Sequence, residues 1–257
     1  MARKRRTQMD CISLSITEWF QNLKDDFLLN FVEEGRYMYI VKGLGITLEV
    51  TFFATLIGIL LGVVVAMIRS SHDKLEEEMR PGFGRSVLAL LNAIARIYLT
   101  IIRGTPTVVQ LMIAYFIIFA SSNNKVLIAI LAFGINSGAY VAEIIRSGIM
   151  SIDPGQFEAG RSLGFNYLQT MLYIVIPQAF KTVLPALANE FIVLIKETSV
   201  SGYVGLQDLT KGGDIIRSRT YSAFMPLLAV AFIYLVIVMF FTKLVTILER
   251  RLRNSER

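Results

Sequence analysis

Two carboxylates stand inside an apolar stretch in the last third of the chain. Glu190 and Glu197 are seven residues apart, so a helix carries them on nearly one face, with Asn189 and Lys196 about 100° further round. A carboxylate within a membrane span is costly unless it faces the interior of a helix bundle or a water-filled cavity. These two acids are therefore candidate partners for an amino group on a ligand.

Further polar side chains occur in two earlier apolar stretches. Asn136, Tyr140 and Glu143 share one face of a helix, and Asn136 can both donate and accept hydrogen bonds near the middle of the membrane. Arg103 stands next to a helix break at Pro106. Its guanidinium can meet a substrate carboxylate, or it can cap the carbonyls that the break leaves free.

A purely structural role for the same residues remains open. Glu190 and Lys196 can pair with residues of another subunit, and Lys196 can neutralise Glu197, so the sequence leaves the charge of the ligand open. For Glu143 we expect an ion pair with Arg146, three residues on, at a helix end. For Glu190, Glu197 and Asn136 we expect a lining role at a ligand path or gate.

The composition places these residues in a membrane. The chain has 257 residues, of which 54% are hydrophobic and 18% charged, and its mean hydropathy is +0.57. The net charge of +6 comes from Lys and Arg in loops and tails, which predicts contact with a membrane surface rather than with nucleic acid. The single cysteine, Cys11, forms no internal disulfide.

Five apolar stretches are long enough to cross a hydrocarbon core of roughly 30 Å, and we expect an all-α membrane protein. They cover residues 44–68, 87–120, 126–150, 183–204 and 221–247, with a charged loop at 69–84. The second is too long for one straight helix, and Gly104 and Pro106 should break it. In the first, Gly58 and Gly62 form a GxxxG pair, a pattern that permits close helix approach but is frequent by chance.

The chain divides into three parts. Residues 1–43 form a basic tail and an interfacial amphipathic segment, 44–248 form the transmembrane domain with a polar insert at 150–177, and 249–257 form a basic tail. The distribution of Lys and Arg predicts that the insert and the C-terminus are cytoplasmic, whereas the loop 201–220 and the N-terminus lie outside. The basic cluster Arg3 to Arg6 conflicts with this orientation.

The insert has a distinctive pattern. Glu158, Ala159 and Gly160 are followed by Gly164 and then by an apolar run that ends at Pro177. Glycine and proline chemistry predicts a short helix, a turn at Gly164 and a second helix that stops near Pro177. The pattern resembles the EAA-type signature of ABC-importer permeases, from which it departs in having Gly160 for the second alanine and Ile176 for leucine.

The resemblance extends over about 43–251. Arg103-Gly104-Thr105-Pro106 with Gln110, the run 136–143 and the run 189–199 are similar to the polar amino-acid permeases of the histidine, glutamine and arginine group. The resemblance implies a type I importer fold with five core helices. It also implies the roles of two sets of residues: substrate-lining Arg103, Gln110, Asn136, Tyr140, Glu190 and Glu197, and ATPase-coupling Glu158, Ala159, Gly160, Gly164 and Pro177.

The same resemblance implies a set of partners in a bacterial plasma membrane. Two copies of an ABC ATPase would bind inside and use ATP and Mg²⁺, an extracellular or periplasmic solute-binding protein would deliver an amino acid, and an identical or homologous second permease would complete the channel. The chain itself has no G-x-x-x-x-G-K-[ST] loop and no H-E-x-x-H or C-x-x-C motif, so we expect no bound cofactor, no metal site and no enzyme activity.

A different class of function is a stand-alone secondary transporter or channel in which Glu190 and Glu197 carry protons or sodium. Five spans without an inverted repeat, together with the insert, argue against it. A third possibility, a purely structural membrane subunit, would leave the intramembrane acids and the broken second span without a purpose.

Overall fold

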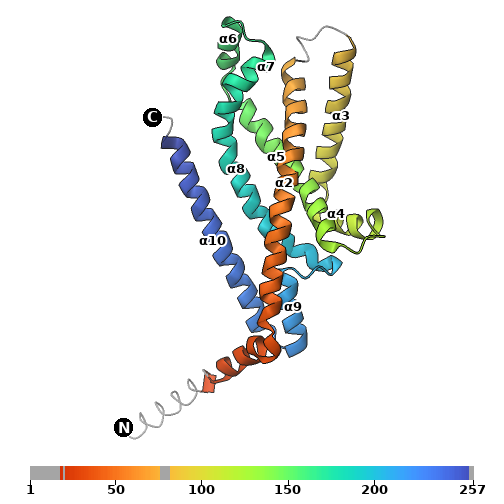
Figure 1. Cartoon of the computed structure of the whole chain (residues 1–257), viewed down its shortest axis with the longest axis vertical. Helices are drawn as coiled ribbons and strands as arrows, with labels where there is room; N and C mark the ends of the chain where they lie inside the picture. The colour runs from red at the N-terminus through yellow and green to blue at the C-terminus, as the bar shows by residue number, and fades with distance from the viewer. Residues whose placement is uncertain (1–17, 20, 76–81, 255–257) are drawn as a thin grey trace, which may run out of the picture.

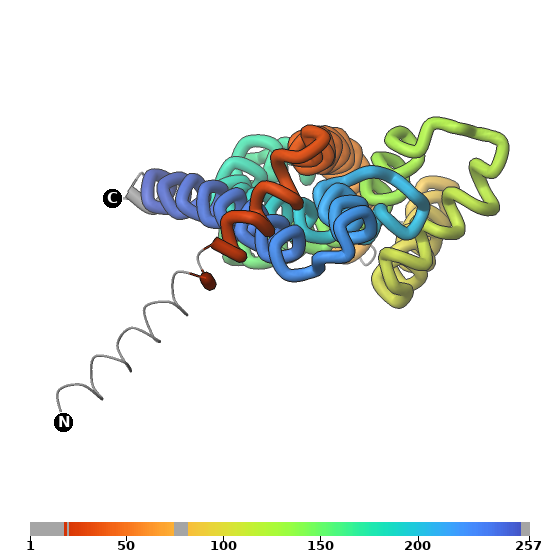
Figure 2. The backbone as a smooth tube through the Cα atoms, turned by 90° about the horizontal axis from the view of Figure 1, so that it is seen from below, coloured from red at the N-terminus to blue at the C-terminus, as the bar shows by residue number. Residues whose placement is uncertain are grey.

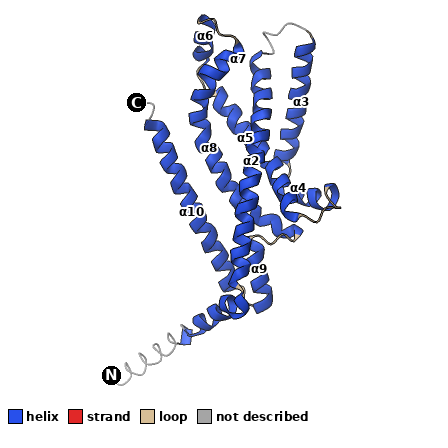
Figure 3. Ribbon diagram, viewed as in Figure 1, coloured by secondary structure: helices blue, strands red, loops and turns tan. Residues whose placement is uncertain are grey.

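The structure is a computed structural model that describes residues 18–19, 21–75 and 82–254. Arg3 to Arg6, Cys11, the middle of the 69–84 segment and the last residues of the basic tail lie outside the described residues. The described part of the chain contains helices and turns and no strand (Figure 3), so the expected all-α class is confirmed.

Five helices are long and apolar enough to cross a membrane, as expected. They belong to α2 (Tyr37–Leu75), α3 (Phe83–Gly104), α5 (Lys125–Met150), α8 (Ile176–Glu197) and α10 (Phe224–Asn254). Shorter helices connect them: α4 (Thr107–Ile113), α6 (Pro154–Ser162), α7 (Tyr167–Thr170) and α9 (Leu209–Thr220). Figure 1 shows the long helices side by side, with the short ones at their ends and at the break after α3.

Three boundaries differ from the sequence expectation. Helix α2 begins at Tyr37 and continues to Leu75, so much of the expected loop at 69–84 is helical. The expected outer loop at 201–220 contains the 3₁₀ helix η5 (Thr198–Val204) and α9. Helix α9 is polar over most of its length and has two glycines, which is why propensity alone does not reveal it; its apolar contacts with α2 and α10 stabilise it.

The two ends of the bundle carry different parts of the chain. One end of the bundle carries the C-terminal end of α2, the N-terminal end of α3, the α6–α7 segment and the C-terminal end of α10 (Phe224–Asn254) (Figure 1). Helix α9 and the start of α2 lie at the other end, which Figure 2 shows face-on, and the described N-terminal segment leads away from it. The start of α2 and the end of α10 therefore lie at opposite ends of the bundle, as an odd number of crossings requires.

Glycines set the closest helix contacts in the bundle. Gly58 and Gly62 of α2 lie directly against α5: a Cβ at Gly58 would meet Ser137 at 3.0 Å, and one at Gly62 would meet Val141 at 2.3 Å. The GxxxG pair therefore brings two helices of the same chain together. The main apolar cluster lies beside this contact and includes Val50, Ala54, Leu111, Ile128, Phe133 and Leu194.

A second close contact fixes α9 to the start of α2. A Cβ at Gly43 would meet the Asp208 carbonyl oxygen at 2.5 Å, and one at Gly212 would meet the Tyr39 carbonyl oxygen at 2.5 Å. The Leu209 amide donates a hydrogen bond to Thr47 Oγ1 at 3.1 Å. Backbone against backbone leaves no flexible side chain that could yield, so α9 and α2 form one rigid unit.

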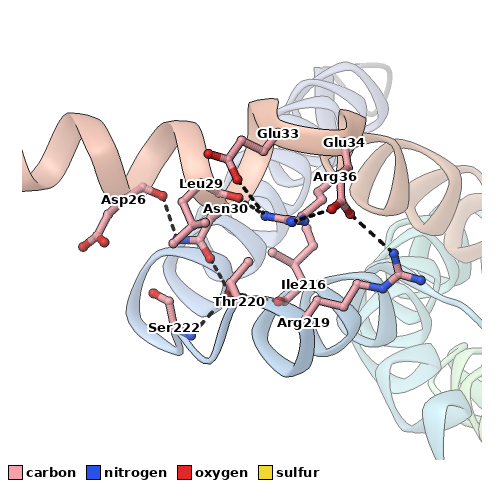
Figure 4. Close-up of polar contacts among 10 residues, drawn as sticks. All are labelled: Asp26, Leu29, Asn30, Glu33, Glu34, Arg36, Ile216, Arg219, Thr220 and Ser222. Atoms are coloured by element: carbon pink, nitrogen blue, oxygen red, sulfur yellow. Dashed lines mark hydrogen bonds and ion pairs between the residues drawn. The ribbon is translucent and has the colours of Figure 1, made fainter.

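The segment before α2 clasps the far end of α9, and Figure 4 shows the contacts. Thr220 Oγ1 donates to Oδ1 of the fully buried Asn30 at 2.8 Å. Arg36, which is almost fully buried, donates to the Leu29 carbonyl and pairs with Glu34 at 3.2 Å. Because Glu34 and the glycine after it are left-handed (φ 53° and 63°), the chain turns sharply before α2 begins. We call these contacts the N-terminal clasp.

Candidate functional site

The second span is broken where the sequence indicates. Thr105 and Pro106 are extended (φ −124°, ψ 147° and φ −65°, ψ 136°), so α3 ends at Gly104 and α4 begins at Thr107. Gln110 satisfies the exposed end of α3, because its Nε2 donates to the Ile102 carbonyl at 2.7 Å and the Thr105 carbonyl at 3.1 Å. The break is thus a fixed feature with its hydrogen bonds made.

Asn136 joins this break to α5. Its Nδ2 donates to Gln110 Oε1 at 3.0 Å, and its side chain is buried at 1% exposure. Its Oδ1 has no hydrogen-bond partner among the described residues. The buried Asn136 is thus tied to Gln110, which stays partly exposed at the break.

Four of the polar residues singled out in the sequence line a single groove of about 480 Å³ between α5 and α8, which we call the α5–α8 groove. Arg103 contributes from α3, Tyr140 and Glu143 from α5, and Glu190 from α8. The small residues Ser147, Gly148 and Ala186 leave the space open. Glu197, the last residue of α8, lies outside this groove, two turns beyond Glu190.

The charges of the groove are arranged asymmetrically. Glu190 accepts a hydrogen bond from Ser137 Oγ at 3.0 Å and pairs with no cation among the described residues. Arg103 lies 3.8 Å from Glu143 and 5.8 Å from the centre of the Tyr140 ring. Glu143 also pairs with Arg146 at 3.4 Å, which confirms the expected i,i+3 ion pair. One carboxylate of the groove is thus engaged by arginines, and the other is available.

The insert forms a compact elbow of two short helices, residues 154–175. Asp153 caps α6 by accepting the Gly155 amide at 2.7 Å, and Pro154 begins the helix. At the end of α6, Gly164 adopts φ 81°, its amide donates to the Arg161 carbonyl at 2.9 Å, and the Phe165 amide donates to the Gly160 carbonyl at 3.0 Å. This is a Schellman cap, and it confirms the turn expected at Gly164.

The second half of the elbow runs directly into the fourth span. Asn166 and Gln169 form a capping box at the start of α7, with both bonds at 2.9 Å. The helix then passes through the π-helical turn η4 (Met171–Val175) into α8, so the expected stop at Pro177 is wrong. Pro177 stands in the first turn of α8, directly after this π turn, so the helix continues through the proline.

Apolar contacts fix the elbow to the spans and leave one side exposed. Phe157, Met171 and Val175 form a buried cluster with Ile149 at the end of α5 and Ala179 of α8. A Cβ at Gly160 would meet Thr170 Oγ1 at 2.7 Å, which explains why glycine replaces the second alanine of the EAA pattern in this chain. Glu158 and Ala159, in contrast, are exposed.

A family model described as binding-protein-dependent transport system inner membrane component matches residues 82–254, which include the groove and the elbow. The chain belongs to this family. It is a multi-pass inner membrane permease of an ABC transporter, and the ATPase and the binding protein are separate partners. Family membership excludes the alternative of a stand-alone secondary transporter or channel.

Known relatives match almost the whole permease. The putative glutamine transport system permease protein of Rickettsia bellii is 33% identical over 230 residues, 88% of this chain and 98% of the relative. The arginine transport system permease protein of Bacillus subtilis is 36% identical over 221 residues, 85% of this chain and 94% of the relative.

Solved structures of ABC transporters contain chains that are similar to this one. The permease is 41% identical to a chain in the crystal structure of an amino acid ABC transporter with histidines, with a TM-score of 0.75 over 86% of this chain and 98% of that one. A chain of an inward-facing methionine ABC transporter is 21% identical with a TM-score of 0.71, covers 86% of this chain and 99% of its own length, and supports the fold alone. The importer permease fold is therefore confirmed.

Sequence reasoning missed one group of polar residues near the groove. Arg69 of α2 and Arg96 of α3 line a second cavity together with Arg103 and Glu143. The sequence predicts Arg69 in a loop, whereas the structure places it in α2. The seven-residue spacing of Arg96 and Arg103 within an apolar span is the signal that could have revealed them.

Proposed function

We propose that this permease conducts an amino acid through the membrane and that the exposed side of the elbow receives the motion of the ATPase. The observation that supports this proposal is the continuity of the helix between the elbow and the groove. The helix that starts in the elbow at Tyr167 continues to Val204 without leaving the helical path, and it carries Glu190 and Glu197. A displacement of the elbow therefore moves one wall of the α5–α8 groove as a rigid body.

The transport cycle follows from this connection. Closure of two ATPase copies on ATP and Mg²⁺ pulls on Glu158, Ala159 and Gly160, and the Gly164 turn and the helix through Pro177 carry the displacement into the span. The groove then changes from inward-facing to outward-facing, accepts the ligand from the solute-binding protein, and releases it inward after hydrolysis. The elbow and the C-terminus are cytoplasmic in this proposal, and the N-terminus is outside.

The amino-acid class rests on the relatives and on the charges of the groove. The named relatives include an arginine permease and a putative glutamine permease. Glu190 has no cationic partner among the described residues and is suited to an α-amino group, whereas Arg103 and Tyr140 face the same groove and are suited to a carboxylate. Asn136 offers its unpaired Oδ1, Gln110 holds Asn136 in place, and Glu197 lines the path beyond the groove.

A second permease copy, identical or homologous, completes the channel in this proposal. Only 17% of the most apolar window of α3 is buried within the chain, although α3 carries Arg96 and Arg103. Arginines at this depth are unfavourable against lipid, so protein or water must cover their side of the helix. A dimer with a central aqueous path provides both.

Reconstitution of the permease with its ATPase and binding protein in vesicles tests the coupling role. We expect the Glu158→Ala and Gly164→Ala variants to insert normally but to lose most ATP-driven uptake of labelled arginine, glutamine or histidine. Glu249→Ala removes an exposed carboxylate at the same end of the protein, outside the elbow, and should transport like the wild type. Full uptake by the Glu158→Ala/Gly164→Ala double variant would contradict the proposal.

Variants of the spans test the lining role separately. Glu190→Gln and Glu197→Gln should change the KM or the ligand preference of uptake, while the ATPase still co-purifies with the permease. Unchanged transport kinetics in both single variants would count against a lining role for these acids.

A further inference from the structure

Helix α3 carries two stripes of side chains over residues 90–103. Leu90, Ile94, Ile97 and Ile101 recur at helical spacing and are each more than half exposed, which suits contact with lipid. Asn92, Arg96, Leu99 and Arg103 recur at the same spacing about 200° away, on the opposite side. A membrane span with a polar stripe needs a polar or aqueous surface facing that stripe.

A second cavity of about 480 Å³ lies along this polar stripe. Residues of three helices line it. Helix α2 contributes Arg69 and α5 contributes Glu143, and α3 contributes Arg96, Leu99, Thr100, Arg103 and Gly104. Its volume is within the range of about 300–1,000 Å³ that small-molecule sites have. Arg103 and Glu143 also line the α5–α8 groove, so the two spaces meet at these two side chains.

The positive charge of this cavity is not neutralised by the described residues. Its only carboxylate, Glu143, already pairs with Arg103 and Arg146. Arg96 makes no ion pair or hydrogen bond among the described residues. Arg69 donates from one Nη to Asn92 at 3.1 Å, but its Nε is buried without a hydrogen-bond partner. Two guanidinium groups thus present unused donors, and an anion is the ligand that such donors fit.

The arginines are spaced along the axis of α3. Arg103 and Arg96 are two helical turns apart, about 10 Å along α3. Asn92, which holds Arg69, is a further turn of about 6 Å toward the end of the bundle that carries the elbow. An anionic group at Arg103 can therefore reach Arg96 and then Arg69 in two short steps.

We propose that Arg96 and Arg69 bind the carboxylate of the transported amino acid after it leaves Arg103, and that this second cavity is its inward exit route. The inference rests on the proposed function and extends it, because it assigns recognition during release to a carboxylate, the group that all amino acids share. The ammonium group stays near Glu190 at the start of this movement.

The test uses the complete transporter in vesicles of neutral phosphatidylcholine, with the labelled amino acid that the wild type takes up best among arginine, glutamine and histidine. Arg96→Gln should lower ATP-driven uptake by at least about tenfold, because a charge-assisted contact is lost. Its ATPase activity, stimulated by the loaded binding protein, should stay within about twofold of the wild type. Arg96→Lys should retain most of the uptake.

Arg85→Gln is the matched control, since Arg85 is an exposed arginine of α3 outside the cavity. It should transport like the wild type. If Arg96→Gln does not assemble with the ATPase, Arg69→Gln at the other end of the cavity decides, with the same expected loss of uptake and normal ATPase activity. Wild-type uptake in these variants would overturn the inference and leave the proposed function standing.

A second arm separates the substrate carboxylate from a lipid phosphate. The same vesicles are prepared with increasing phosphatidylglycerol. For a carboxylate site, the Arg96→Gln defect is the same at every lipid composition. If wild-type uptake instead rises with anionic lipid and Arg96→Gln abolishes that rise, the cavity holds a lipid headgroup and the inference is wrong. If the wild type takes up none of the amino acids, the proposed function and the inference both fail.

Discussion

Both ends of the permease carry a short helix packed against the spans, but the two helices are held in different ways. Helix α9 meets α2 through backbone contacts at Gly43 and Gly212, and the N-terminal clasp secures its far end. Helix α6 is held through side chains: its own Phe157 packs into the apolar cluster, and its Gly160 lies against the Thr170 side chain of α7. Caps fix both ends of α6. The α9 end is therefore held by contacts between backbones, which we call the interlocked end, whereas the elbow is held by contacts between side chains, which we call a side-chain joint.

The difference indicates how each end can respond to force. A backbone contact has no rotamers, so α9 must move together with α2 or not at all. A joint made of apolar side chains can slide by small rotamer changes while it stays buried. The elbow also exposes Glu158 and Ala159, whereas Asp208 at the start of α9 is 1% exposed. These features match an end that receives motion and an end that keeps its shape.

Gly43→Ala tests the interlocked end most strongly. The added Cβ would lie 2.5 Å from the Asp208 carbonyl, and because that atom belongs to the backbone we expect a loss of about 3 kcal/mol of stability. Gly45→Ala, two residues away on the same helix, has no atom within 4 Å of its Cβ and should be neutral or slightly stabilising. The midpoints of thermal unfolding in detergent, measured by circular dichroism, compare the two. Equal unfolding midpoints for the two variants would show that the backbone contact at Gly43 does not hold α9 against α2.

Asp208, at the same end, should make the stability of the folded protein depend on pH. Burial raises its pKa from 3.8 to about 6, so the folded state keeps the proton longer than the unfolded state. Stability should therefore fall by about 2 kcal/mol as the pH rises from 4 to 7. Asp208→Asn keeps the capping oxygen and should be more stable than the wild type at pH 7, with a flatter profile.

Asp214 is the control for this titration. Its pKa is lowered by hydrogen bonds from Lys211 and Arg217, so its contribution to stability is present above its unfolded pKa and is lost as the pH falls. Asp214→Asn should thus be slightly less stable than the wild type at pH 7, by less than about 1 kcal/mol because the pair is partly exposed. A stability profile that does not change in Asp208→Asn would contradict the role given to Asp208.

Gly160→Ala tests whether the elbow is a side-chain joint. Its Cβ would meet Oγ1 and Cγ2 of Thr170 at 2.7 and 2.8 Å, so we expect a loss of about 1–2 kcal/mol. Because the obstacle is a side chain, the Gly160→Ala/Thr170→Ala double variant should recover most of this loss. The double-variant cycle is measured by thermal unfolding. A purely additive result would show that Thr170 is not the obstacle.

Of the two elbow variants, Asn166→Ala should have the smaller effect. It removes one half of the capping box at the start of α7 and should cost about 1 kcal/mol. Hydrogen exchange followed by mass spectrometry should show faster exchange in 154–175 and no change in 209–220. Faster exchange in both segments would mean that the two ends are coupled through the spans more strongly than their contacts indicate.

Local residue chemistry predicted the elements whose geometry depends on it. Pro106 removes a donor, so the break after Gly104 was expected and occurs. Gly164 tolerates a positive φ, so the turn in the elbow was expected and occurs. The ion pair of Glu143 and Arg146 follows from helical spacing in the same way. In each case the cause lies within a few residues of the effect.

The features that were missed depend on contacts between distant parts of the chain. Helix α9 has little intrinsic helical signal, and Gly43, about 170 residues earlier, makes room for it. The continuation of the helix through Pro177 depends on an adjustment in the preceding turn. The spacing of Arg96 and Arg103 is visible in the sequence, but the cavity that Arg96 shares with Arg69 and Glu143 forms only when three helices pack together. The lining and coupling roles of individual residues remain predictions for the experiments above.

The π-helical turn Met171–Val175 has a consequence for the direction in which the elbow faces. Such a turn holds one residue more than an α-helical turn, and one residue corresponds to about 100° of rotation. Deleting a single residue there would restore a regular helix and swing α6 about a quarter-turn around the axis of α8. Under the proposed function, this one inserted amino acid sets the direction from which the ATPase would meet the elbow.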